Sequence, residues 1–551
     1  MDNWAMLLQV AIFLPSAGAL AIALAWPRKP EAQRAASRFI AMAAVLLTFA
    51  LSGLLVARFP AGSVEFAVST GAFWFGDARG GAEIQFSLGL DGLSLWLFGL
   101  TSLLMITAVA VSWKAIDRHC RAYYSLLLVL ETGMLGVFCA RDIILFYVFF
   151  EATLIPLFFL IGVWGSSDRR YAAIKFFLFT LAGSLLTFLG LLAIVWWDYS
   201  QSRGMTFSIW ELTSGLIRRP MPVPLQLAVF LALFAGFAVK VPLFPLHTWL
   251  PLAHVEAPTA GSVVLAGILL KIGGYGFVRF SLPMLPEATA LLMPWLVGLS
   301  AAGIIYGALV ALAQADIKRL IAYSSVSHLG FCMLGIFAAN RLGIQGGVLQ
   351  MVNHGLSTGG LFALVGMLYE RYHTREIKDY GGIARRLPVL AFFMLLMTLS
   401  SIGLPGLNGF AGEFLLLVGM FQRAWAGSSG PLAVYRAASV LAVFGVVLGA
   451  WYMLWLVERV FFGPLREPAV EQGQPSPPIR DLSAREVAGL VPLVVFIFWI
   501  GLQPSFFLNR MGPALDRLTA AAVRAAERGG PAGGDRFAET SIAKGDLGGV
   551  E

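Results

Sequence analysis

Two lysines stand in the middle of apolar runs that are long enough to cross a bilayer. Lys240 lies in the run 237–247, and Lys271 lies in the run 267–276. A lone charge inside a membrane helix costs at least about 2.5 to 3.5 kcal/mol and is a functional candidate by default. The chain prefers arginine, with 31 arginines against 8 lysines. A buried ammonium can lose its proton whereas a guanidinium effectively cannot, so both positions are predicted to exchange protons.

Each lysine lies beside residues that interrupt a helix. The motif Lys-Val-Pro-Leu-Phe-Pro at 240–245 lacks two backbone donors, and the pair Gly273 and Gly274 is predicted to loosen the helix after Lys271. Broken membrane helices persist only where the freed backbone groups face protein or water. The breaks therefore predict a hydrated interior cavity at mid-depth, as in transporters.

Further ionisable residues are predicted at membrane depth. They are Glu131, Glu151, His328, His354 and Glu413. An acid and an amine brought together can pass between an ion pair and two neutral groups, which would load and release a proton. Glu151 is the expected partner of Lys240.

Structural roles have to be weighed against these. Ion pairing alone stays open for the central glutamates and lysines, although four charges in mid-span are hard to justify by packing. His328 and His354 could be satisfied core histidines, but imidazole titrates in the useful pH range. Both interpretations stay open for Glu131. His247 and His254 flank a predicted cytoplasmic turn, where a helix-end role and a proton-uptake role both stay open.

The composition excludes a soluble domain. Of the 551 residues, 58% are hydrophobic and 13% charged, and the mean hydropathy is +0.79. These values predict an all-α polytopic membrane protein with about fourteen transmembrane helices. The predicted spans are 3–26, 36–58, 90–113, 121–140, 142–164, 171–196, 223–246, 258–281, 288–312, 318–338, 345–369, 387–419, 433–463 and 487–505.

The basic residues indicate membrane topology rather than nucleic-acid binding. The net charge of +8 arises from residues in short loops, without a patch of interleaved aromatics. Loops after spans 1, 3, 5, 9, 11 and 13 hold about 21 basic residues against about 10 in the opposite loops, which puts both termini outside. The first helix lacks a basic n-region and an Ala-x-Ala site, so it is predicted to be a retained span.

No cofactor or metal is predicted on this chain. Cys120, Cys139 and Cys332 have no CxxC or four-thiolate spacing, so iron-sulfur ligation by this chain alone is excluded and a disulfide is not expected. The glycines at 273–276 resemble a phosphate loop only superficially, because no strand precedes them.

The chain is predicted to repeat itself. A second broken helix is expected at 401–414, near Pro405 and Gly406. Matched breaks separated by five spans indicate inverted-topology repeats, because an odd number of helices flips the second unit. The expected divisions are helices 1 to 3 (1–115), a first five-helix repeat of helices 4 to 8 (116–284), a second of helices 9 to 13 (285–465), a loop with helix 14 (466–510), and a C-terminal tail (511–551) that is disordered from 529. A hairpin is expected within the external loop 62–85.

Four stretches carry a resemblance to a known family. They are Tyr-Val-Phe-Phe-Glu-Ala-Thr-Leu-Ile-Pro at 147–156, the Lys-Val-Pro-Leu-Phe-Pro-Leu-His-Thr-Trp stretch at 240–259, Asp-Ile-Lys-Arg-Leu-Ile-Ala-Tyr-Ser-Ser-Val-Ser-His-Leu-Gly at 316–330, and Leu-Pro-Gly-Leu-Asn-Gly-Phe at 404–410. They resemble the antiporter-like membrane subunits of respiratory complex I and of multi-subunit sodium/proton antiporters, and the similarity covers spans 4 to 13. The M branch of the complex I subunits is similar in carrying glutamate, here Glu413, where the L, N and antiporter chains carry lysine.

The resemblance implies a proton-translocating, non-redox subunit of NADH:quinone oxidoreductase in a bacterial inner membrane. It implies that Glu151 and Lys240 form a coupling pair and that Lys271 is the central bridge. His328 and His354 would lead to Glu413 as the terminal group near the exit. The implied partners are other complex I membrane subunits, including antiporter-like neighbours, and the bilayer, with no nucleic acid. A cation/proton antiporter subunit and a membrane-bound hydrogenase subunit are the alternatives, and a purely structural scaffold is disfavoured by the central charges.

Overall fold

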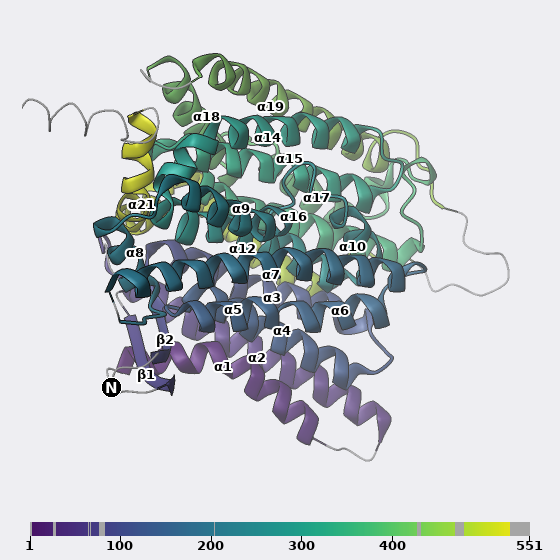
Figure 1. Ribbon diagram of the computed structural model, residues 1–551. Helices are drawn as coiled ribbons and strands as arrows, with labels where there is room; N and C mark the ends of the chain where they lie inside the picture. Colours follow the sequence, from purple (N-terminus) through teal and green to yellow (C-terminus); the bar gives the residue numbers. More distant parts are fainter. Residues whose placement is uncertain are drawn as a thin grey trace, which may run out of the picture.

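The computed structural model describes residues 3–25, 29–63, 66, 68–76, 83–202, 204–426, 431–468 and 479–528. This part of the chain is a bundle of long helices with one two-stranded hairpin (Figure 1). Thirteen of the described helical segments are long and apolar enough to cross a membrane. The predicted all-α polytopic fold is confirmed, and the predicted tail from 529 lies outside the described residues.

Each predicted span overlaps one helix or one interrupted helix of the structure. The spans up to the middle of the chain are α1 (Asn3–Leu24), α2 (Pro30–Arg58), α3 (Gly92–Ala115), α4 (Cys120–Cys139), α5 (Ile143–Ala152) with α6 (Leu154–Trp164), α7 (Arg169–Ser202) and α9 (Val223–Lys240) with α10 (Leu250–Glu256). The later spans are the segment from α11 (Thr259–Val264) through η1 (Leu265–Leu269), α12 (Leu270–Gly276) and η2 (Phe277–Ser281) to α13 (Leu282–Met284), then α14 (Pro286–Leu312), α15 (Ile317–Phe337), α16 (Arg341–Tyr372), α17 (Pro388–Ser401) with α18 (Asn408–Trp425), α19 (Leu432–Phe461) and α20 (Ala484–Leu502). Outside these spans lie α8 (Ile209–Arg218), the short helices η3 (Ile377–Asp379) and η4 (Ile383–Arg385), and α21 (Pro504–Glu527).

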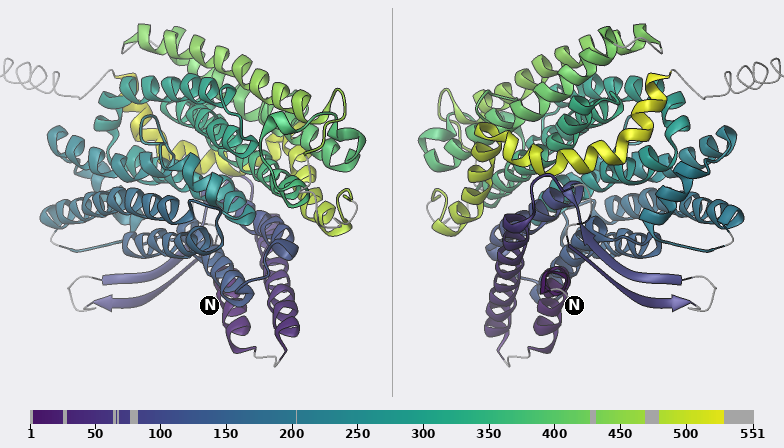
Figure 2. Two further views of the ribbon diagram at one scale, coloured as in Figure 1. Left: turned by 90° about the vertical axis from the view of Figure 1, so that its right-hand side faces the viewer. Right: turned by 90° about the vertical axis from the view of Figure 1, so that its left-hand side faces the viewer.

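The expected hairpin is present between α2 and α3. Strands β1 (Val68–Gly76) and β2 (Glu83–Leu90) pair antiparallel and extend away from the helices (Figure 2). At the other end of the chain, α21 continues beyond the predicted last span and runs across the bundle, where it packs against α3, α13 and α14 (Figure 2). The division into two inverted five-helix repeats stays a prediction.

The first broken helix ends at Lys240, as the prolines predict. Because prolines 242 and 245 have no N–H, the last carbonyls of α9 lose their helical partners. Leu243 N donates to Ala238 O (2.9 Å), and the indole N–H of Trp249 donates to Val239 O (3.0 Å). The freed carbonyls are therefore satisfied inside the protein, and the chain resumes as α10.

The Lys271 helix is continuous, which corrects the prediction that Gly273 and Gly274 loosen it. Both glycines lie within the regular turns of α12, and π-helical turns lie on either side of it, at η1 and η2. A Cβ at Gly273 would meet Phe237 O and Val241. The missing side chain allows α12 to pack closely against the end of α9, so the glycine serves packing rather than a break.

The second broken helix lies where it was predicted. Between α17 and α18, Gly403 and Gly406 have φ values of 73° and 92°, which glycine adopts without steric cost. The helices carrying Lys271 and His354 are the most enclosed of the candidate spans, because every residue of their most apolar stretches is buried. The central charged residues therefore lie in the interior of the chain.

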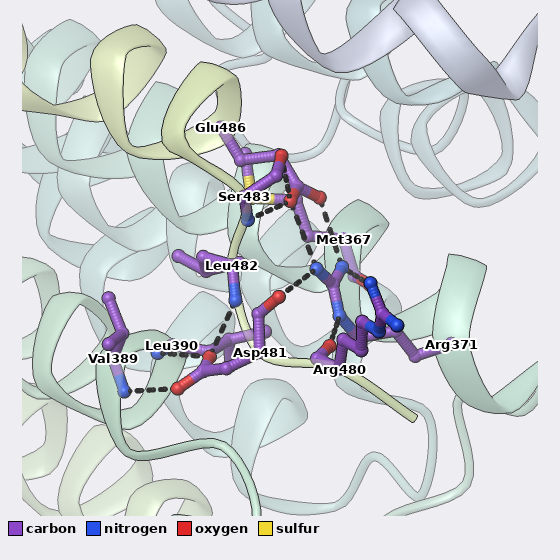
Figure 3. A network of polar contacts seen from close by, with 9 residues as sticks. All are labelled: Met367, Arg371, Val389, Leu390, Arg480, Asp481, Leu482, Ser483 and Glu486. Carbon is purple, nitrogen blue, oxygen red and sulfur yellow. Dashed lines mark hydrogen bonds and ion pairs between the residues drawn. The ribbon is translucent and has the colours of Figure 1, made fainter. Parts of the chain in front are cut away.

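A polar network holds the N-terminal end of α17 against α16 and α20 (Figure 3). Arg371 at the end of α16 donates to both carboxylate oxygens of Glu486 at the start of α20, at 3.0 Å each. Asp481 accepts hydrogen bonds from the N–H groups of Val389 (2.7 Å) and Leu390 (3.1 Å) in the first turn of α17. Such bonds satisfy donors that a helix N-terminus leaves free, so the start of α17, the end of α16 and the start of α20 are tied together at the end of α17 that lies opposite the second break.

Candidate functional site

Lys271 and His354 meet directly in the core. Lys271 is fully buried, and its Nζ lies 2.6 Å from His354 Nδ1. The same ammonium also donates to Ala266 O in the π-helical turn η1. The two residues are 83 positions apart in the chain, so the folding of α12 against α16 creates a contact that the sequence does not display.

The line continues from His354 to Glu413. The rings of His354 and His328 have centroids 5.8 Å apart, and His328 Nδ1 lies 3.6 Å from Glu413 Oε1. Ser401 Oγ and Tyr452 OH each lie 3.2 Å from His328 Nε2. An amine, two imidazoles and a carboxylate therefore follow one another through the interior, and each can exchange a proton with its neighbour or through one water.

Side-chain amides hold the far end of this line. Gln350 Nε2 donates to Glu413 Oε1 (3.0 Å), and Asn353 Nδ2 donates to Gln350 Oε1 (2.9 Å) and Asn408 O (2.8 Å). Ser400 Oγ donates to Asn408 Oδ1 (2.6 Å). None of these four polar residues had a role predicted from the sequence. A signal was present, because Gln350 and Asn353 interrupt an apolar helix within one turn of His354.

Lys240 has a different environment. Its ammonium lies 4.6 Å from the centre of the Phe150 ring, a cation–π contact. Glu151, the next residue on α5, is partly exposed and is the charged group that acts on Lys240. The ion pairs within 4.0 Å in the described chain do not include this pair. Glu151 is thus an electrostatic neighbour of Lys240 rather than a direct contact.

The remaining predicted residues lie apart from this line. Glu131 on α4 is fully buried, and its carboxylate oxygens have no hydrogen-bond partner among the described residues. His247 packs against Tyr306 with ring centroids 5.1 Å apart. His254 on α10 stacks on Phe362 at 4.5 Å. The structure therefore joins Lys271, His354, His328 and Glu413, and it leaves Glu131, His247 and His254 outside.

Sequence reasoning missed one buried ion pair and one buried lysine. Arg279 on η2 forms a bidentate ion pair with Asp91 before α3, at 2.6 and 2.8 Å, and the pair lines a cavity of about 100 Å³ beside α8 and α21. Lys318 at the start of α15 is buried and donates to Ala257 O (2.6 Å). Arg279 falls inside a predicted span, which was a usable signal. Lys318 had been used only as an indicator of topology.

The fold and this buried line define a multi-pass membrane protein in which titratable side chains cross the interior beside two broken helices. Transporters have this arrangement. Residues 140–433 match the family described as NADH:quinone oxidoreductase/Mrp antiporter, TM. The chain is 42% identical to NADH-quinone oxidoreductase subunit M of Rhodobacter capsulatus, over 93% of this chain and 96% of that protein. It is also 42% identical to NADH-ubiquinone oxidoreductase chain 4 of Chondrus crispus, over 88% of this chain and 92% of that protein.

Solved structures agree with these relatives. A chain of respiratory complex I from Thermus thermophilus with bound NADH superposes with a TM-score of 0.80 at 31% identity, covering 94% of this chain and 99% of that chain. A chain of the Mrp complex from Dietzia sp. DQ12-45-1b shares the fold, with a TM-score of 0.75 at 23% identity over 97% of this chain and 55% of that chain. The protein belongs to the NADH:quinone oxidoreductase/Mrp antiporter family, in the branch of the NADH-quinone oxidoreductase M subunits. The predicted resemblance is confirmed.

Proposed function

We propose that this chain translocates protons across the membrane as a subunit of an NADH:quinone oxidoreductase. Its relatives of 38 to 42% identity include M subunits of that enzyme, which favours this function over a cation/proton antiporter subunit. The observation that carries the proposal is the continuous buried line from Lys271 through His354 and His328 to Glu413. Burying a chain of titratable groups costs free energy, so such a chain inside a membrane protein marks a functional site by default.

The residues have distinct proposed roles. Glu151 and Lys240 act as the coupling pair, in which a change of charge on one alters proton affinity on the other. Lys271 receives the proton, the two histidines pass it on, and Glu413 is the terminal group. We also propose that the chain holds no redox group of its own. Redox chemistry on other subunits then reaches it as a conformational or electrostatic change.

The proposed partners and orientation follow from the same features. Glu151 is partly exposed on a face where Val148 (45%) and Ile155 (55%) are also exposed. A carboxylate at that depth is expensive against lipid, so this face of α5 and α6 is proposed to lie against another membrane subunit. By the positive-inside rule, both termini are proposed to lie outside.

Lys240→Arg in the assembled complex tests the proposed function. Arginine keeps the charge and the cation–π contact but cannot release its proton. Redox-driven proton pumping in membrane vesicles, followed by acridine-dye quenching, is expected to fall by about tenfold or more. NADH oxidation by an artificial acceptor should stay normal, which reports intact assembly. Lys378→Arg, at an exposed position, is the matched control. Full pumping in Lys240→Arg would overturn the proposal.

A further inference from the structure

The cavity beside α8 and α21 lies apart from the line from Lys271 to Glu413. It measures about 100 Å³, and α8 and α21 lie at the same end of the bundle (Figure 1). By the predicted topology, this end faces outside. A water molecule occupies about 30 Å³ in the liquid, so the cavity has room for a group of a few heavy atoms. The lining residues that carry a charge or a hydroxyl are Asp91, Thr213, Ser214, Arg279, Arg517 and Arg524.

The lining of this cavity is positively charged. Asp91 is the one carboxylate among the described lining residues, and it is already committed to Arg279 by the bidentate ion pair. Arg524 on α21 adds a charge that this pair does not offset. Arg517 lies on the same helix, with its guanidinium 3.6 Å from the centre of the Trp210 ring. Such an excess is unexpected on a face whose loops hold about half the basic residues of the opposite loops. The cavity is therefore complementary to an anion.

Arg279 has a donor left over at this cavity. A guanidinium has five N–H donors. Arg279 is buried, and it donates from Nε to Tyr275 OH (3.0 Å), from Nη1 and Nη2 to Asp91, and from Nη2 to Ser94 Oγ (3.1 Å). Within the described chain, the fifth N–H, on Nη1, has no acceptor. A buried donor without a partner costs free energy, and an anion in the cavity would satisfy it.

The mouth of the cavity has an apolar side. Ile217 on α8 lines the cavity and is 59% exposed. The same helix lies outside the spans and buries Ile209, Leu212 and Leu216 against the protein, so it is amphipathic, as helices at a membrane surface are. Trp210 is also of a type enriched at membrane interfaces. An anion that carries apolar chains would place them beside Ile217, which favours a phospholipid head group over a free anion.

We propose that this cavity binds the phosphate group of an anionic phospholipid from the outer leaflet. Arg524 and the fifth N–H of Arg279 donate to the phosphate oxygens. Guanidinium groups suit phosphate in charge and geometry, and basic pockets between membrane helices bind anionic head groups. The bound lipid joins α8 to α21 and helps to hold α21 across the bundle. This inference does not depend on the proposed function, because it requires no proton transfer.

Photo-crosslinking tests the site in the assembled complex. The complex is reconstituted in phosphatidylcholine vesicles that contain a small share of phosphatidylglycerol with a diazirine in its head group. After irradiation, mass spectrometry quantifies the α8 and α21 peptides that carry this lipid. Arg524→Gln removes the charge but keeps a polar side chain, and labelling is expected to fall by about tenfold. Arg528→Gln is the matched control, since Arg528 is exposed about one turn further along and does not line the cavity. Its labelling should match that of the unchanged protein.

A second variant keeps the inference testable if Arg524→Gln does not assemble. Ala521 lines the cavity from α21, so Ala521→Leu fills the space and keeps every arginine. Its labelling should fall as that of Arg524→Gln does. NADH oxidation by an artificial acceptor reports the amount of assembled complex, to which the labelling is normalised.

Competition identifies the source of the phosphate. Unlabelled phosphatidylglycerol should displace the label, whereas a large molar excess of inorganic phosphate should not. Displacement by inorganic phosphate would show a site for a free anion and would overturn the lipid assignment. Equal labelling of Arg524→Gln, Ala521→Leu and Arg528→Gln would show ordinary contact with the bilayer and would overturn the site, as would an unlabelled cavity in the unchanged protein. None of these readouts requires turnover, so the lipid site can fail while the proposed function stands, and the reverse.

Discussion

The two interrupted helices carry opposite kinds of site. Lys240 is the last residue of α9, and its ammonium packs against an aromatic ring. The charge that acts on it belongs to Glu151, which does not contact it directly. Glu413 lies just inside α18 with a hydrogen bond from Gln350 and with His328 at 3.6 Å. The first charge therefore depends on one distant partner, whereas the second is embedded in a network of dipoles.

The difference has a physical consequence. A charged group in a largely apolar site is stabilised chiefly by its counter-ion. Removing the counter-ion therefore leaves an uncompensated buried charge. A network of hydrogen bonds distributes the stabilisation over several groups and can absorb the loss of one. Removing a charge of the Glu151 and Lys240 pair is therefore expected to abolish pumping, whereas substitutions in the network around Glu413 are expected to reduce it by degrees.

Glu151→Ala is expected to have the largest effect. Lys240 loses its counter-charge while the packing of α5 is retained, so redox-driven pumping should fall to near background with assembly intact. Dye quenching in vesicles measures the pumping, and NADH oxidation with an artificial acceptor measures assembly. Glu458→Ala, at an exposed carboxylate of α19, is the matched control. Near-normal pumping in Glu151→Ala would contradict the coupling pair.

Two substitutions of Glu413 are expected to lower pumping to different extents. Glu413→Gln keeps the shape and the hydrogen bond from Gln350 but cannot titrate, so pumping and coupled quinone reduction should both fall strongly. Glu413→Asp shortens the reach by one methylene yet keeps the acid, so part of the activity should remain. Rates of quinone reduction and of dye quenching in the two variants distinguish an acid-base role of Glu413 from a geometric one. Equal behaviour of the two would show a geometric role and remove Glu413 as the terminal group.

The sequence predicted the spans and the two breaks at prolines, after Lys240 and near Pro405, because hydropathy, proline and mid-span charge are local properties. It could not predict which spans meet. The contact between Lys271 and His354 and the hydrogen bond from Gln350 to Glu413 join helices that are far apart in the chain. Gly273 was misinterpreted for a related reason, since a glycine that loosens a helix and a glycine that admits a neighbouring helix are identical in a sequence. The ion pair of Asp91 and Arg279 was missed likewise.

Gly273→Ala tests the close packing that joins the two lysine helices. A methyl group would press on Phe237 O and Val241 and push α12 away from the end of α9. Forced overpacking costs about 1 to 3 kcal/mol, so pumping and the yield of assembled complex should both drop several-fold. Gly298→Ala on α14 is the matched control, because a Cβ there meets nothing within 4 Å. Equal tolerance of both substitutions would restore the interpretation of Gly273 as a flexible point.

Neutral groups at the two sites are expected to have smaller effects than the charged residues, and the ratio of their effects sharpens the comparison. Tyr452→Phe removes one hydroxyl from His328 and leaves Ser401 at the same nitrogen. A single hydrogen bond is worth about 0.5 to 1.5 kcal/mol net, and its loss inside a network should cost the lower part of that range, about twofold in pumping.

Phe150→Leu removes the ring from the Lys240 ammonium, a contact worth about 0.5 to 2 kcal/mol. Because no comparable network surrounds that lysine, the loss should be larger, about three- to tenfold. Pumping rates normalised to assembled complex measure both. A Tyr452→Phe variant that is more impaired than Phe150→Leu would show that the hydroxyl itself transfers protons through His328, and the contrast between a distributed and a concentrated site would then be wrong.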